Sequence, residues 1–489
     1  MKKTALRRMT AGVGALAIAL VGLGAASTAA NAEVGPDQGG PTEGTLTINK
    51  YSGGPVEGQP DPANLLDGVE FTVTQVGRLV GDDCVAINLT QAAAWTGLEA
   101  LFASAPAAPT ATFCLTNVVQ DDVTVDGQVV FDLEVGIYFV EETDPGANSI
   151  VSPVPPFYVS IPTSNGADGD GWNYDVVADP KNQLMEQPSK TITEGQDDLV
   201  VGSEVEWTIT VPIPTLNNDE TFTQAVIRDA LDSRLTLVPD SSVVEIDGVP
   251  TTNFVVTGNA VWTFNPDGRA ELDAAMGSEI TITFKTTVDS VGNGAVPNDE
   301  YESTFNGTTV PGEVVPYTYW GQLAILKVDD SEPQLPLEGA KFVVFPANAS
   351  GTCEAVAPDD TPTATGTSND NGVVQWEDVD PADVLGLWIA NVNNGPAAPT
   401  PTKVYCVYET VAPAGHTLVP AGQAVTIAVG EDNNNIKEIT VTNPKKDGPD
   451  LPLTGAQGTL LMTVGGLLLV AIGTGAIVLS RRRHVGADV

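Results

Sequence analysis

Histidine and basic residues are scarce in this chain, and each shortage excludes a class of function. The 489 residues include two histidines, His416 and His484, so histidine-based catalysis has almost nothing to work with. The four cysteines and two histidines show no metal-ligand spacing, so we expect no metal and no cofactor. Lysine and arginine total 21 against 63 acidic residues, and such a surface repels nucleic acid and anionic lipid.

Long apolar stretches lie near the two ends of the chain. Basic residues, an Ala/Gly/Leu/Val stretch and the A-x-A site Ala30-Asn31-Ala32 predict a signal peptide over residues 1–32. Near the other end an uncharged run over residues 456–480 is long enough to cross a bilayer, and the basic tail 481–489 holds that end in the cytoplasm. A five-residue LPLTG motif precedes the run, formed by Leu451, Pro452, Leu453, Thr454 and Gly455. The motif and its placement predict a sorting signal, and an ordinary single-pass anchor is the alternative.

Between these ends the sequence predicts an all-β protein. Alternating apolar and polar residues, separated by turn residues, are typical of sandwich strands, whereas helical patterning is scarce. A segment of about 420 residues is too long for one core and suggests three domains. We place a flexible leader at 33–44, the domains at 45–182, 188–317 and 321–443, and a linker at 444–450.

Four cysteines in an exported chain suggest two disulfides. The natural pairs are Cys84–Cys114 and Cys353–Cys406, because each pair lies within one predicted domain. Other pairings remain open.

The first and third domains look like distant repeats. Each opens with an alternating strand that ends in lysine, Lys50 or Lys327. Each carries a late Y-x-V-x-E-T strand, with Glu142 or Glu409 as its acid, and each closes on a valine-rich strand ending in Pro-Lys.

Strand alternation directs three reactive side chains of the third domain inward. Lys327, Glu409 and Asn443 each share a strand face with apolar residues. Burial moves the pKa of the lysine and of the acid toward their neutral forms. A neutral amine is a nucleophile and a neutral acid can polarise an amide carbonyl, so a Lys327–Asn443 amide could form once, with loss of ammonia. A buried Lys–Glu salt bridge beside a strand-capping Asn443 is the alternative.

Residues 405–415, YCVYETVAPAG, resemble the E-box of CnaB-type immunoglobulin-like domains, Y-x-V-x-E-T-x-A-P-x-G-Y. His416 stands where that family usually has tyrosine. In the family the E-box glutamate catalyses a Lys–Asn isopeptide bond, so the resemblance implies this role for Glu409.

The middle domain resembles CnaA-type domains, in which an aspartate catalyses the same bond. The resemblance implies Lys190 as nucleophile, Asp229 as acid and Asn298 as partner, with Asn306 as runner-up. A solvent-facing Lys190 is the alternative.

The first domain departs from the pattern. Lys50 and Glu142 match it, but Asp179 occupies the position equivalent to Asn443. A Lys50–Asp179 amide would form with loss of water, Asn182 is another possible partner, and a domain without a cross-link is equally compatible with the sequence.

Residues 172–181, WNYDVVADPK, resemble the pilin motif W-x(3)-V-x-V-x-P-K, with Ala178 and Asp179 as departures. In that family the lysine attacks the threonine acyl-enzyme of the next subunit, which implies an intermolecular amide between Lys181 and Thr454. We expect Lys181 to be exposed and to lie outside any hydrogen-bonded strand. An interdomain linker lysine is the alternative.

As a whole the chain resembles SpaA/FimA-type major pilins of Gram-positive bacteria. The resemblance implies cleavage between Thr454 and Gly455 by a pilin-specific sortase, a covalent polymer of identical subunits, minor tip and base pilins, and a final transfer to peptidoglycan by a housekeeping sortase. It also implies an extracellular pilus, attached to the cell wall, that touches an unknown host or surface receptor. A monomeric wall-anchored adhesin or minor pilin is the alternative. An extracellular glycosidase is disfavoured because no separate catalytic domain is visible, so we expect no enzyme with turnover.

Overall fold

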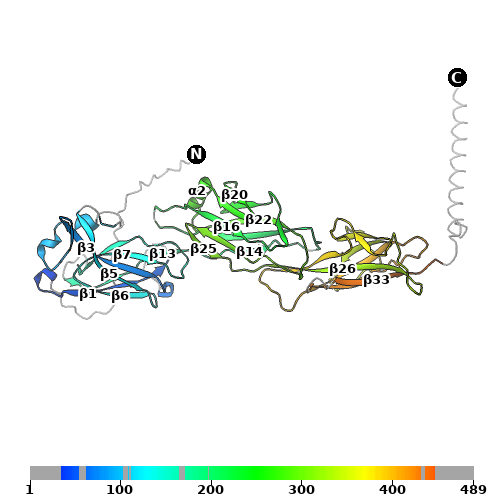
Figure 1. Ribbon diagram of the computed structural model, residues 1–489, viewed down its shortest axis with the longest axis horizontal. Helices are drawn as coiled ribbons and strands as arrows, with labels where there is room; N and C mark the ends of the chain where they lie inside the picture. The colour runs from blue at the N-terminus through cyan, green and yellow to red at the C-terminus, as the bar shows by residue number, and fades with distance from the viewer. Residues whose placement is uncertain are drawn as a thin grey trace, which may run out of the picture.

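A computed structural model describes residues 35–53, 62–102, 108–109, 112–164, 171–196, 198–217, 219–430 and 436–446. The predicted signal peptide, the LPLTG motif with Thr454, the apolar run and the basic tail lie outside the described residues. Within the described part of the chain, no helix combines the length and the apolar character needed to cross a membrane. Three β domains follow one another in an elongated row (Figure 1).

The first domain is a sandwich of two sheets. Its short sheet has the order β12-β1-β6, in which β1 pairs with β12 in parallel and with β6 antiparallel. Apolar residues alternate along β1 and β6 and face the core, as a half-buried strand requires. The strands of this sheet are β1 (Glu43–Asn49), β6 (Gln128–Glu134) and β12 (Asp175–Ala178). The facing sheet contains β3 (Glu70–Val80), β4 (Asp83–Ala86), β5 (Phe113–Val123), β7 (Gly136–Asp144) and β9 (Phe157–Ile161).

Shorter elements complete the first domain. A third sheet of order β2-β13-β8 lies toward the middle domain and contains Lys181, the first residue of β13. The strands of this third sheet are β2 (Tyr51–Ser52), β8 (Ile150–Ser152) and β13 (Lys181–Leu184). A separate two-stranded sheet contains β10 (Thr163–Ser164) and β11 (Trp172–Asn173). The helices are η1 (Pro36–Gln38), η2 (Pro62–Asn64), η3 (Ala92–Trp95) and α1 (Glu99–Phe102).

The middle domain packs two larger sheets around a core that contains Trp207, Trp262 and Phe284. One sheet contains β14 (Ser189–Ile192), β15 (Glu204–Pro212), β17 (Leu235–Leu237), β18 (Val243–Ile246), β19 (Val249–Thr251) and β22 (Glu279–Val288). The other contains β16 (Ala225–Asp229), β20 (Phe254–Thr257), β21 (Val261–Phe264), β24 (Tyr301–Phe305) and β25 (Thr308–Pro311). The helix α2 (Pro266–Ala274) begins after Asn265, whose side chain accepts a hydrogen bond from the Gly268 amide.

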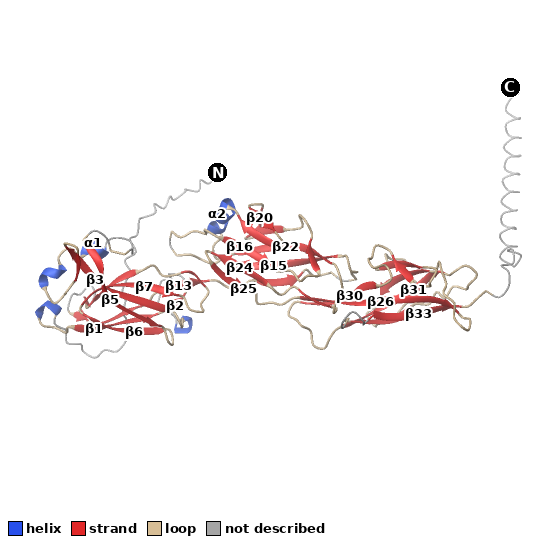
Figure 2. Ribbon diagram, in the orientation of Figure 1, coloured by secondary structure: helices blue, strands red, loops and turns tan. Residues whose placement is uncertain are grey.

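The third domain is again a two-sheet sandwich. Its first and last strands, β26 and β33, lie side by side in parallel. One sheet contains β23 (Ala295–Pro297), β26 (Tyr317–Asp329), β30 (Leu385–Val392) and β33 (Ile436–Asn443). The other contains β27 (Lys341–Pro346), β28 (Ala364–Ser368), β29 (Val374–Trp376), β31 (Thr402–Val411) and β32 (Gln423–Ala428). Strands dominate all three domains (Figure 2).

One predicted domain boundary differs from the structure. We placed a break between residues 317 and 321, but β26 runs through it without interruption. The strand β23, from the predicted middle domain, pairs with the start of β26. The two domains therefore share backbone pairing rather than a free linker.

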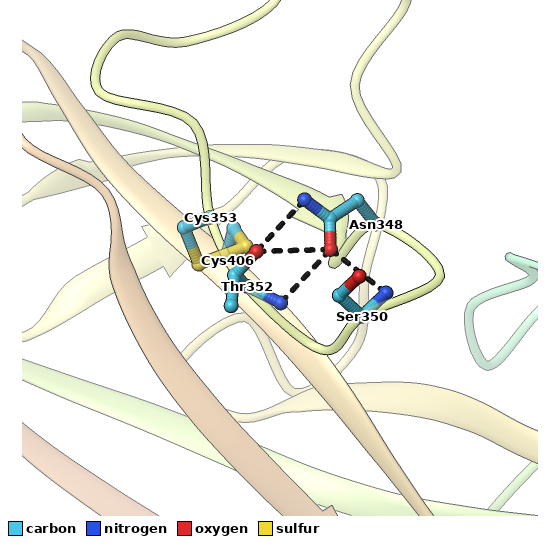
Figure 3. Close-up of a disulfide and its surroundings, with 5 residues drawn as sticks. All are labelled: Asn348, Ser350, Thr352, Cys353 and Cys406. Atoms are coloured by element: carbon cyan, nitrogen blue, oxygen red, sulfur yellow. Dashed lines mark hydrogen bonds between the residues drawn. A yellow bond between two sulfur atoms is a disulfide. The ribbon is translucent and has the colours of Figure 1, made fainter.

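Both predicted disulfides are present. Cys84 on β4 is bonded to Cys114 on β5, and Cys353 is bonded to Cys406 on β31. Beside the second bond, the Asn348 side chain accepts hydrogen bonds from the amides of Ser350 and Thr352, each at 3.0 Å (Figure 3). The disulfide and this turn hold the loop after β27 against the outer face of β31.

Candidate isopeptide sites and the linking lysine

In the third domain the structure brings the predicted lysine, acid and amide into one buried site. Asn443, at the end of β33, donates its side-chain amide to Glu409 Oε2 on β31 at 2.7 Å. The Lys327 amine on β26 donates to the carbonyls of Val441 and Val328, at 2.9 and 3.0 Å. Lys327 and Asn443 come from adjacent strands of one sheet, and Glu409 reaches them from the facing sheet. This is the arrangement that strand alternation predicts.

Two polar atoms of this site have no hydrogen-bond partner among the described residues. They are Glu409 Oε1 and Asn443 Oδ1, and both are buried. An unpartnered buried polar atom destabilises the folded state, and a reactive role is one reason for a native structure to keep it. The Asn443 carbonyl is the group that a Lys327 amine would attack, so its lack of a partner leaves it free to react.

The middle domain forms a tighter version of the same site. The Lys190 amine on β14 contacts Asp229 Oδ2 at 2.5 Å, and neither side chain is exposed to solvent. Asp229 Oδ2 also accepts the Asn298 side-chain amide at 3.3 Å. The rings of Trp207, Phe284 and Tyr301 surround the amine, the nearest centroid being 5.0 Å away.

The runner-up partner in the middle domain lies elsewhere. The Asn306 side chain accepts the backbone amides of Thr223 and Gln224, and its φ of 47° places it in a left-handed turn. Its side-chain oxygen is therefore part of a turn rather than of the lysine site, and Asn298 is the partner that the geometry favours.

In the first domain Asn182, not Asp179, meets the lysine. The Lys50 amine contacts Asn182 Oδ1 at 2.5 Å and Glu142 Oε2 at 2.8 Å. The Asn182 amide donates to the other oxygen of Glu142 at 2.7 Å. The three side chains are buried, and each contacts the other two.

The structure does not place Asp179, the first predicted partner, at the Lys50 site. Asp179 is exposed, and its carboxylate accepts the side-chain amide of Asn49 at 2.9 Å. The strand β12 ends at Ala178, and β13, which begins at Lys181, pairs with β2 instead of β1. Asp179 shares the exposed face of Asp175 and Val177, whereas Asn182 has the parity of the buried Val176 and Ala178, so counting alternation along β12 favours Asn182.

Burial shifts the pKa of the three lysines and of Asp229 toward their neutral forms. Desolvation lowers the pKa of Lys50 and that of Lys190 to about 8, although the neighbouring carboxylates oppose the shift. Desolvation also lowers the pKa of Lys327 and raises that of Asp229. With a pKa near 8, about one amine in ten is neutral at pH 7, against about one in 3,000 for an ordinary lysine. Burial thus enlarges the minor neutral fraction of each lysine amine, and in the middle domain it also favours the neutral acid of Asp229.

Lys181 is less exposed than its motif predicts. It is half-buried, and it pairs in parallel with Tyr51 of β2. None of the described residues forms an ion pair or hydrogen bond with its amine. Lys181 immediately precedes Asn182 in the chain, a proximity that the sequence shows but that gains meaning only once Asn182 is known to face Lys50.

The fold and these sites define a class: a rod of tandem β-sandwich domains, each with a buried lysine, acid and asparagine. Residues 443–485 match the family model described as the LPXTG cell wall anchor motif. The chain is 28% identical to the type 2 fimbrial subunit of Actinomyces naeslundii, over 98% of this chain and 97% of that one. It is 27% identical to the type 1 fimbrial subunit of Actinomyces viscosus, with the same coverage.

A solved structure gives the same result. The full-length major pilin SpaD from Corynebacterium diphtheriae matches with a TM-score of 0.59 and 25% identity, over 83% of this chain and 98% of that one. With the anchor motif and the fimbrial relatives, this match identifies the chain as a shaft pilin of the sortase-assembled Gram-positive type. It is extracellular and anchored to the cell wall.

Proposed function

We propose that the shaft is a covalent polymer in which Lys181 of one subunit is joined to Thr454 of the next. A sortase would break the Thr454–Gly455 peptide bond, releasing the Gly455 amine and holding the Thr454 carbonyl as an acyl-enzyme. The Lys181 amine would then displace the enzyme and form the new amide. A housekeeping sortase would pass the last subunit to a peptidoglycan amine. Minor tip and base pilins and a host or surface receptor complete the proposed set of partners.

Inside each domain we propose one further amide, made without any enzyme. The lysine amine attacks the asparagine side-chain carbonyl, the neighbouring acid transfers protons, and ammonia leaves. The pairs are Lys50–Asn182, Lys190–Asn298 and Lys327–Asn443, with acids Glu142, Asp229 and Glu409. Each reaction would occur once per chain, so this role is structural rather than enzymatic.

The position of Lys181 beside Asn182 is the observation that supports the polymer most. Tension from a neighbouring subunit would enter the chain at Lys181, at the start of the short strand β13. A four-residue strand would peel off easily by itself. A covalent bond between the next residue, Asn182, and Lys50 would fasten this strand to the strand that opens the domain.

Co-expression of the full chain with a pilin sortase tests the proposal. We expect a ladder on denaturing gels that disappears in Lys181→Ala. Lys341→Ala is the matched control, because Lys341 is an exposed lysine of the third domain. A ladder that persists in Lys181→Ala would assign the linkage to another lysine. Monomers from the native chain, despite cleavage after Thr454, would indicate a singly anchored surface protein.

A further inference from the structure

Middle-domain backbone pairs with both sides of the third domain's β26 sheet, at the start of β26 and along β30, while β33 covers the rest of β26 on the first side. On one side β23 pairs antiparallel with the start of β26, and the backbone amide of Asn298 donates to the Pro316 carbonyl at 2.9 Å. On the other side residues 199–201 lie along β30, where the Val201 amide donates to Gly386 at 3.1 Å and the Trp388 amide donates to Leu199 at 3.0 Å. An open sheet edge would leave such groups unpaired, so these contacts complete the sheet.

Beside β30, one lysine contacts an aspartate of the middle domain and two aromatic rings of the third domain. Lys403, on β31, forms an ion pair with Asp198 of the middle domain. Its amine also lies 4.4 Å from the ring centroid of Trp388 and 5.2 Å from that of Tyr405. The two charged side chains are only 19% and 34% exposed, so solvent screens this contact less than an open surface pair.

The two domains approach closely enough to require glycine at the contact. A Cβ built on Gly386 would lie 2.2 Å from Val201 Cγ2, and valine is stiff about χ1. A Cβ on Gly294, in the loop before β23, would lie 2.4 Å from the Gly430 amide nitrogen. Any larger side chain at these positions would push the domains apart. We call these contacts, from residues 198–201 and β23 to the third domain, the joint.

The proposed Lys190–Asn298 bond ends beside the joint, because Asn298 directly follows β23, but none of the three proposed cross-links joins the middle domain to β26 or to a later strand. Such ties resist unfolding of a domain, but they do not stop one domain from rotating relative to the next. Backbone pairing on both sides of this sheet, from β23 to β26 and from Val200 to Leu387, opposes rotation of the third domain against the middle domain that precedes it in the row (Figure 1).

We propose that the middle and third domains form a single rigid unit, held by this non-covalent joint. The joint, rather than the cross-links, sets the bending stiffness of this part of the rod. The two sets of contacts share one residue, Asn298, whose side chain faces the Lys190 site and whose backbone amide bonds to Pro316 in the joint. The inference does not depend on polymerisation through Lys181, since it concerns one chain.

Spin-label distance measurements on the full mature chain test the joint. The four native cysteines are disulfide-bonded, so cysteines introduced at the exposed positions Val255 and Thr426 carry one label in each domain. We expect a single narrow distance distribution in the native background. Two independent changes should broaden it: Gly386→Ala, which wedges the edge open, and the pair Lys403→Met with Asp198→Asn, which removes the ionic contact.

The matched control removes an ion pair that lies wholly within the middle domain. Lys285→Met with Glu204→Gln deletes a contact of 3.1 Å and should leave the distribution narrow. Intact mass should still show the loss of one ammonia per cross-link in every variant. A broad distribution in the native chain, or an unchanged one in both joint variants, would overturn the proposal. Loss of the third-domain cross-link in a joint variant would show that joint and cross-link are not independent.

Discussion

Replacing Asn298 by alanine should remove the middle-domain cross-link while the Lys190–Asp229 ion pair stays in place. The asparagine makes one side-chain hydrogen bond to Asp229, at 3.3 Å, and its Oδ1 has no hydrogen-bond partner among the described residues. The non-covalent loss is therefore only about 1 kcal/mol. Most of the effect of the substitution should come from the missing bond.

The size of that effect follows from the length of chain that the bond closes. Lys190 and Asn298 are 108 residues apart. Closing a loop of this length lowers the entropy of the unfolded chain by an amount worth about 5 kcal/mol at 25 °C. At about 4 °C per kcal/mol for a domain of this size, the calorimetric midpoint of the middle domain should fall by about 20 °C.

Intact mass and scanning calorimetry on the same samples check this reasoning. The native chain should lack one more ammonia than the Asn298→Ala chain, once the substitution itself is subtracted. Asn306→Ala is the control and should keep the bond, because Asn306 lies in a turn away from Lys190. Equal ammonia loss in the native and Asn298→Ala chains would refute the assignment. A bond lost with a midpoint change of only a few degrees would refute the entropic argument.

Three further outcomes are expected. In the first domain Asn182→Ala should abolish the Lys50 cross-link and Asp179→Ala should retain it, as peptide mapping would reveal; the reverse result would restore Asp179 as the partner. In the Asn298→Ala background, the folded chain releases the Lys190 proton near pH 8 while the unfolded chain keeps it up to about 10.5, so stability should rise with pH across this window. The free energy of unfolding, measured with urea, should increase by roughly 3 kcal/mol across this pH window. A free energy of unfolding that does not change with pH would mean that Lys190 is not buried as a free amine. Removing the Cys353–Cys406 disulfide, which closes a loop of 53 residues, should lower the stability of the third domain by up to about 4 kcal/mol. The Lys327–Asn443 bond should still form, and its absence would show that the disulfide is needed to place Glu409.

Sequence pattern and family resemblance together indicated most residues of the three buried sites, because many of these residues lie within regular strands. Period-two alternation is sufficient to place Lys327 with Leu323 and Ile325, and all three are buried. The same rule, with the E-box resemblance, places Glu409 and Asn443. Both disulfides followed from assigning each cysteine pair to one domain.

The sequence by itself thus determined the strand faces, the disulfide pairs and the lysine and acid of each site. Tertiary structure decided that β13 pairs with β2, which half-buries Lys181 and brings Asn182 against Lys50. It also decided that β26 continues across the predicted boundary and that middle-domain backbone pairs with the start of β26 and with β30. Alternation is a local property of one strand, whereas strand partners and sheet edges depend on residues more than a hundred positions apart.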